Sequence, residues 1–307
     1  MTYKRCVAAA AALSFCLCAF CQPGRFERKY ALLVSQLGPA GVGVETVLDN
    51  WEAEDSTDAK MLLGRFSYYF AKSQTGAVVQ KPQSRYLGME PILSLKDSTG
   101  NDVHYFQVNE FDDELYAKAV KAADRAISFW PDRLDFRFLK ANAYIAYEKE
   151  SPDMALSYLK NLASEGAAKT AAWEYEGEEV DGDFFAEAMQ EYCYSFYSIG
   201  SPSSYEAFRS LSEHLVKLYP EHVGFVNNIG SYHMVAKNDY KTALKYYAKV
   251  LKKRPDDYTA IKNGTLAARK AGNRKLELKY LALLAEHGTE NERMAAEARI
   301  KSLSGGR

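Results

Sequence analysis

Small and aromatic residues recur at intervals of about 34 residues in the C-terminal part of the chain, and this spacing constrains the fold more than any other feature. Gly264 follows Gly230 by 34 positions, and Tyr280 follows Tyr247 by 33. A unit of this length is typical of a helix pair that cannot bury its apolar face alone. The sequence therefore predicts an all-α fold in which successive helix pairs stack into an array.

The clearest unit extends from Val226 to Pro255, and its marker residues each have a packing role. Gly230 lets the second helix of the pair approach the first, and Ala243 is the small residue at their crossing. Tyr247 is expected to fill the gap between successive pairs. Pro255 ends the second helix, because proline cannot donate a backbone N–H to the preceding turn.

These spacings resemble the tetratricopeptide signature of Leu-Gly, Tyr, Ala, Phe or Tyr, Ala and Pro. The next unit keeps Gly264 and Tyr280, but it has Leu276 in place of the alanine and no proline after it. The resemblance covers most of the chain. It implies an α-α superhelix, or solenoid, whose groove is lined by the first helix of each pair and binds peptides or protein surfaces.

Upstream segments carry weaker versions of the same pattern. Leu62 and Leu63 precede Gly64 in a predicted first helix near the N-terminus. A later first helix is predicted from Arg133 to Tyr147, with Ala141 in the position of the glycine. The sequence thus indicates about four to five helix pairs in all.

Two stretches interrupt the helical period. Between residues 76 and 110, apolar runs at 92–95 and 103–106 flank a polar turn, which predicts an inserted hairpin within one helix pair. Residues 164–183 contain an acidic run and are expected to form a solvated loop. The expected organisation is a signal peptide at 1–21, helices at 22–75, the insertion at 76–110, helices at 111–163, the acidic loop at 164–183, helices at 184–303 and a disordered tail at 304–307.

The first residues have the layout of a signal peptide. Lys4 and Arg5 precede an apolar run of about 15 residues that ends in Ala19-Phe20-Cys21, a small-x-small cleavage site. That run is shorter than the roughly 20 residues a spanning helix needs, so we expect cleavage after Cys21 and no membrane span in the mature chain. This predicts an exported protein, periplasmic or extracellular. A lipoprotein at a membrane surface and an uncleaved anchor are the alternatives.

Four of the five cysteines lie in this leader, which leaves Cys193 alone in the mature chain. No internal disulfide can then form. Within Tyr192-Cys193-Tyr194 the thiol is interpreted as a buried apolar filler, with a reactive thiol as the alternative.

The composition favours no catalytic, metal or nucleic-acid function. The formal net charge is −1, which creates no field for nucleic acid, and the five histidines are scattered without zinc-ligand spacing. Asp181-Gly182-Asp183 supplies oxygen ligands but lacks the order of a calcium loop. A basic tract from Lys249 to Lys279 is interpreted as a solvated helix face or a contact for an acidic partner. We therefore expect no metal, no cofactor and no enzymatic activity.

The predicted function is a scaffold that binds an unidentified protein or peptide in the groove of first helices. The repeat register places six candidate binding residues there: Phe138, Asn142, Asn227, Ser231, Tyr258 and Arg269. One alternative is a ligand-binding or enzymatic site in the insertion, around His104 and Tyr105. Another is a structural spacer in a cell-surface assembly.

Overall fold

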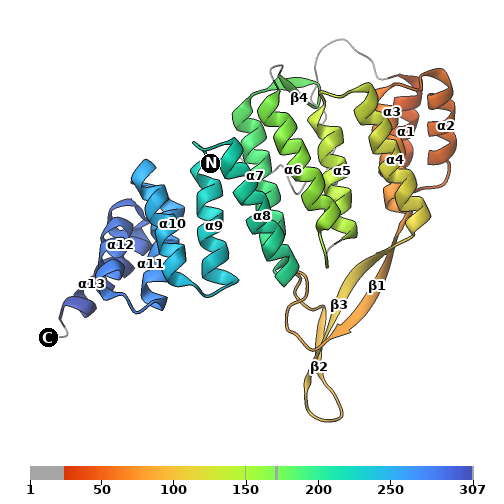
Figure 1. Ribbon diagram of the computed structural model, residues 1–307. Helices are drawn as coiled ribbons and strands as arrows, with labels where there is room; N and C mark the ends of the chain where they lie inside the picture. Colours follow the sequence, from red (N-terminus) through yellow and green to blue (C-terminus); the bar gives the residue numbers. More distant parts are fainter. Residues whose placement is uncertain (1–23, 149, 170–171, 306–307) are drawn as a thin grey trace. The chain divides into compact units, whose positions relative to one another are not determined.

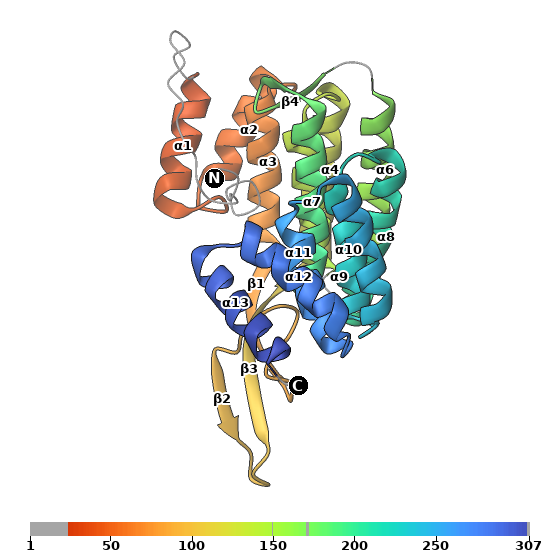
Figure 2. The same ribbon diagram turned by 90° about the vertical axis from the view of Figure 1, so that its left-hand side faces the viewer.

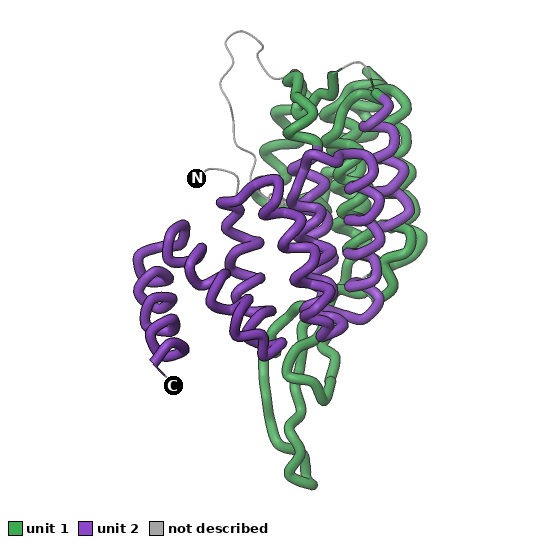
Figure 3. Tube along the Cα trace, turned by 60° about the vertical axis from the view of Figure 1, so that its left-hand side comes forward, with its two compact units in different colours: residues 1–155, 169–185 green, residues 156–168, 186–307 purple. Residues whose placement is uncertain are grey.

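The computed structural model describes residues 24–148, 150–169 and 172–305, so the predicted signal peptide at 1–21 lies outside the described residues. The chain divides into two compact units (Figure 3). Unit 1 comprises residues 1–155 and 169–185, and unit 2 comprises residues 156–168 and 186–307.

Unit 1 is a run of helices interrupted by a small sheet (Figure 1). Its helices are α1 (Arg25–Leu37), α2 (Val44–Glu54), α3 (Ala59–Lys72), α4 (Asp113–Phe129) and α5 (Leu134–Tyr147). Each of these helices packs against the next along the chain. Asp58 and Asp112 cap α3 and α4, because their carboxylates accept backbone N–H groups that the first helical turn leaves free.

Among its described residues, the regular elements of unit 2 are all helices. It contains most of α6 (Asp153–Ala168) and α7 (Gly182–Ile199), followed by α8 (Pro202–Leu218), α9 (Val223–Val235), α10 (Tyr240–Lys253), α11 (Tyr258–Lys270), α12 (Arg274–His287) and α13 (Glu290–Ser304). From α8 onward each helix packs on its successor. Five of these helices begin just after a residue whose side chain accepts a backbone N–H of the first turn: Ser201, Asp239, Asp257, Asn273 and Thr289. The cap at Thr289 is a capping box.

Glycine–tyrosine contacts hold together the two helices of the pairs α9–α10 and α11–α12 in unit 2, as predicted for Gly230, whereas Tyr247 makes this contact within its own pair and not between successive pairs. A methyl group added to Gly230 would lie 2.7 Å from Cε1 of Tyr247, and one added to Gly264 would lie 2.2 Å from Cε1 of Tyr280. The tyrosine ring of each second helix therefore occupies the space that the glycine of its first helix leaves open. Ala243 is fully buried beside Tyr247. The described residues are mostly helical, with one inserted β segment between α3 and α4, which confirms the predicted helical fold class.

The remaining marker residues lie at helix ends and crossings. Pro255 follows the last residue of α10 and its cap, as expected. Ala141 is fully buried on α5. Gly64 on α3 differs from the two later glycines, because its added methyl group would meet Leu48 of α2 and Tyr30 of α1. Here the glycine accommodates the preceding helices rather than a following tyrosine.

The insertion is a three-stranded antiparallel sheet rather than a two-stranded hairpin. Its strands are β1 (Gln74–Lys81), β2 (Leu93–Lys96) and β3 (Asp102–Phe111), in the order β1-β3-β2. β2 and β3 coincide with the two predicted strands, whereas β1 is additional. The strands run away from the ends of α3 and α4, which pack against each other (Figures 1 and 2). We call residues 74–111 the β-finger.

The acidic stretch 164–183 is not a loop, which corrects the sequence-based expectation. Residues up to Ala168 continue α6, and β4 (Trp173–Tyr175) pairs with β5 (Glu178–Val180). Glu176 and Gly177 both have positive φ, as a two-residue hairpin turn of type I′ requires. Trp173 anchors this hairpin, because its ring stacks on Phe185 and is buried. At the C-terminus, Ser304 ends α13 and residues 306–307 lie outside the described residues.

Candidate functional site

The first helices α7, α9 and α11 of unit 2 lie side by side and are joined by side-chain amides. Gln190 and Asn228 exchange two hydrogen bonds of 2.9 and 3.0 Å between α7 and α9. Asn263 Nδ2 donates to Ser231 Oγ at 3.4 Å between α11 and α9. These contacts fix which side of each helix points outward.

Exposed apolar side chains and polar groups occur together on the three helices. We call the surface formed by Tyr194, Ser231, Val235, Lys262 and Leu266 the first-helix face. Tyr194 on α7, Val235 on α9 and Leu266 on α11 are 61%, 37% and 44% exposed. Ser231 and Lys262 lie near them, one turn before Val235 and Leu266 respectively. Each of the three neighbouring first helices thus has an exposed apolar side chain, with a hydrogen-bonding group one turn before it on α9 and α11.

The second helices support this face from below. The Tyr247 hydroxyl lies 3.4 Å from Ser231 Oγ and 3.9 Å from Met234 Sδ. Burial raises the pKa of Tyr247 to about 12, and burial likewise raises that of Tyr280 to about 12. Both rings therefore stay neutral at physiological pH and act as fixed packing elements beneath α9 and α11.

Four of the six predicted binding residues belong to unit 2, and the structure gives them different surroundings. Asn227 is only 4% exposed and donates to Asp257 Oδ1 at 3.0 Å, so it joins α9 to the start of α11 instead of projecting outward. Ser231 is half-buried on the first-helix face. Tyr258 donates to Glu292 Oε1 at 2.6 Å, and Arg269 donates to Glu277 Oε1 at 3.0 Å.

The other two predicted residues belong to α5 of unit 1. The ring of Phe138 is centred 6.2 Å from that of Tyr175 in β4, so it packs beside the β4–β5 hairpin. Asn142 is exposed one helical turn further along α5.

Sequence reasoning missed Tyr194, Val235 and Leu266. The sequence contains the helix register of all three, because each lies four positions after a polar residue: Tyr194 after Gln190, Val235 after Ser231 and Leu266 after Lys262. An apolar residue at such a position is the available signal. It is ambiguous without the rotation of each helix, because the same spacing also marks a core face.

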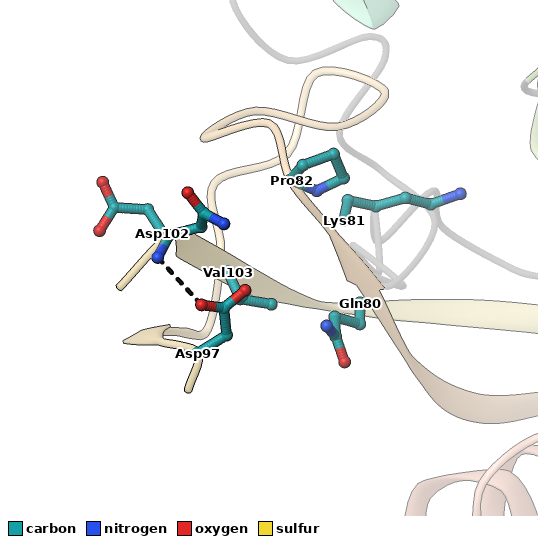
Figure 4. Close-up of a pocket in the computed structure, with 7 residues that line it drawn as sticks. Gln80, Lys81, Pro82, Asp97, Asp102 and Val103 are labelled. Carbon is teal, nitrogen blue, oxygen red and sulfur yellow. Dashed lines mark hydrogen bonds between the residues drawn. The ribbon is translucent and has the colours of Figure 1, made fainter. Parts of the chain in front are cut away.

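The β-finger offers a shallow pocket whose polar groups are largely occupied. It is lined by Gln80, Lys81, Pro82, Asp97, Asn101, Asp102 and Val103 (Figure 4). Asp97 Oδ1 accepts hydrogen bonds from Thr99 and from the Asn101 N–H, and these bonds lower the pKa of Asp97. Asp102 pairs with Lys96 at 3.0 Å. The carboxylates thus stabilise the turn between β2 and β3.

Two further groups named in the sequence analysis have ordinary structural surroundings. His104 Nδ1 lies 2.8 Å from Ser94 Oγ across the sheet. Cys193 is fully buried, and burial raises the pKa of its thiol to about 12, so it is the apolar filler that the sequence indicated. No group of three or more potential metal-ligating side chains occurs within the part of the chain that the structure describes. None of the described helices has both the length and the apolar composition needed to cross a bilayer.

Comparison with known proteins gives the following. No protein-family model matches the sequence, and no curated protein is significantly similar to it. A crystal structure of MamA protein is 15% identical with a TM-score of 0.38, covering 57% of this chain and 84% of that one. A PilF structure from Pseudomonas aeruginosa is 14% identical with a TM-score of 0.38, covering 64% of this chain and 87% of that one.

Proposed function

We propose that this chain is a non-catalytic scaffold that binds a segment of another protein on the first-helix face of unit 2. The observation that supports this most strongly is that Tyr194, Val235 and Leu266, one on each of three neighbouring helices, are exposed apolar residues, which we call the apolar row. Covering apolar side chains of this size is worth about 25 cal/mol for each Å² removed from water. A partner segment that fits this face carries apolar side chains separated by the distance between neighbouring helices of the array.

Polar groups beside this row supply orientation. Ser231 offers a hydroxyl, and Lys262 offers an ammonium group on an exposed side chain. Lys262 also forms a 3.0 Å ion pair with Glu292. The lysine side chain is exposed, so water competes for its ammonium group. A partner carboxylate that binds Lys262 therefore replaces Glu292 as its ion-pair partner. That exchange contributes to the orientation of the partner more than to affinity.

The arrangement supports binding rather than catalysis. The Cys193 thiol is buried and protonated, and the carboxylates of the β-finger pocket already accept hydrogen bonds within their own turn. The first-helix face holds a hydroxyl, an ammonium group and apolar surface. These groups recognise a partner, and among the residues that the structure describes no base lies within hydrogen-bond distance of the Ser231 hydroxyl to activate it.

We further propose that the scaffold works outside the cytoplasm, because residues 1–21 have the sequence of a cleavable leader. Mass spectrometry of the protein purified from its own cells tests this directly. The expected N-terminal residue is Gln22. A chain that retains Met1, or a lipid on one of the leader cysteines, would contradict the proposed processing.

The binding proposal is tested by charge substitution on the first-helix face. Val235→Asp combined with Leu266→Asp places two carboxylates in the apolar row. A matched control, Ala248→Asp with Ala282→Asp, adds the same charge at exposed positions of α10 and α12. We expect proteins cross-linked to the wild type in cells to be lost from the first variant and kept by the control. Retention of every partner by both variants would refute the proposal.

A second candidate site is one face of the β-finger. The strand register places Gly76, Val78, Gln80, Leu93, Leu95, Val103, Tyr105 and Gln107 on a single face without any charge. Val78, Leu93 and Leu95 are 60%, 50% and 51% exposed. Removing the β-finger separates the two candidates, because partners bound by the first-helix face survive that deletion.

A further inference from the structure

The outer side of α10 carries a row of lysines that the proposed function does not use. Lys241, Lys245, Lys249 and Lys252 are all exposed. At 100° per residue these four side chains fall within an arc of about 80° and extend along about 17 Å of helix. The opposite side of α10 holds the buried Ala243, Leu244, Tyr247 and Val250.

This row is not neutralised within the described part of the chain. α10 contains five lysines and no acidic residue. Lys253 pairs with Glu221 at 3.1 Å, whereas the four lysines of the row form no ion pair among the described residues. The carboxylate of Asp239 caps the helix by accepting the Thr242 N–H at 2.9 Å. The row is therefore a local positive surface on a chain whose formal net charge is only −1.

The side chains of the row indicate which kind of anionic partner fits. Protein interfaces are depleted of lysine and gain most of their affinity from aromatic residues and arginine. On the outer side of α10 the remaining exposed residue is the small Ala248, and the exposed large apolar side chains of the chain lie elsewhere. Lysine is a strongly hydrated point charge on a flexible stem, which suits a diffuse, planar array of anions.

We propose that the outer side of α10 rests on the surface of a bilayer that contains anionic lipids. Attraction of this kind is peripheral, because α10 has no exposed large apolar residue to insert, and it weakens as salt shortens the Debye length. Each lysine near such a surface increases binding roughly fivefold, so four lysines together contribute several hundredfold. This inference is independent of the first-helix face and its partner.

Sedimentation with lipid vesicles tests the proposal on the protein purified from cells that express the full-length gene. Vesicles of 30% phosphatidylglycerol in phosphatidylcholine are compared with pure phosphatidylcholine at low salt. The test variant carries Lys→Gln at 241, 245, 249 and 252. The matched control carries Lys29→Gln, Lys121→Gln, Lys270→Gln and Lys301→Gln, which are exposed lysines outside α10. All proteins are compared with the same N-terminus, so any membrane affinity of that segment cancels.

We expect the wild type and the control variant to bind the anionic vesicles and to be released by 0.5 M salt. The α10 variant should bind several hundredfold more weakly, and its circular dichroism should be unchanged. Equal loss in both variants would show a general charge effect and overturn the proposal. Binding of polyglutamate or duplex DNA without binding of the vesicles would overturn it in favour of an acidic protein or a nucleic acid.

Discussion

The pairs α9–α10 and α11–α12 differ from the pair α3–α4 in how their two helices are connected. In the first two pairs the connection is a turn of a few residues, whereas the β-finger separates α3 from α4. The helices of all three pairs nevertheless pack against each other. Helix pairing in this fold is therefore fixed by side chains along the helices, and the connection is free to acquire other structure.

The largest expected effect on the free energy of unfolding comes from removing the tyrosine of a glycine–tyrosine contact. Tyr247→Ala removes a fully buried ring between α9 and α10 and should lower the free energy of unfolding by about 4 kcal/mol. Tyr246→Ala is the matched control, because Tyr246 is half-buried and its ring stacks on His233. Urea denaturation of both variants measures the difference. Equal losses would show that the buried ring has no special role.

The glycine side can be tested at the equivalent contact of the next pair and compared with a glycine of the β-finger. Gly264→Ala should cost about 2 kcal/mol, because the new methyl group would lie 2.2 Å from the Tyr280 ring. Gly76→Ala in the β-finger should cost much less, since its nearest neighbour atom is 3.9 Å away. Adding Tyr280→Leu to Gly264→Ala should recover part of the loss. If the two changes are instead additive, the steric explanation is wrong.

Unit 2 should also lose stability in acid through Glu206. This carboxylate accepts from the Tyr232 hydroxyl at 2.5 Å and from Lys237 at 2.9 Å, and these bonds lower its pKa from 4.5 to about 2. A depressed carboxylate pKa contributes stability above the unfolded value, and that contribution is lost as the pH falls from about 4.5 to about 2. The melting temperature of Glu206→Gln should therefore approach that of the wild type over this range. A constant difference between them would contradict the assignment.

The smallest expected effect is that of removing the β-finger. Replacing residues 77–108 by Asn-Gly leaves Gly76 opposite Asn109, a register that a two-residue turn can close. The buried Phe106 packs on Tyr86 within the β-finger, so its core is lost without opening the helical core. We expect a change below about 1 kcal/mol in unfolding free energy. Loss of cooperative unfolding would show that the sheet holds α3 against α4.

The sequence was sufficient to predict α9 to α12, because glycine, alanine and tyrosine at fixed spacing have one efficient packing solution. It did not reveal β1. This strand pairs with β3, which is distant along the chain, so no short turn between the two strands marks them as a hairpin. The β4–β5 hairpin was hidden by its glutamates, although Trp173 supplies the buried anchor. Asn227 was placed on the correct helix, but its burial depends on helix rotation, which the spacing alone leaves undetermined.

Site-specific photocross-linking in the native cells tests the binding role of the first-helix face most directly. A photoreactive phenylalanine derivative is introduced at Leu266 on that face or at Ala248 on the outer side of α10, both of which are exposed. We expect a discrete protein adduct from position 266 and no protein adduct from position 248. Adducts of the same protein from both positions, or none from position 266, would contradict the assignment of this face as the binding surface.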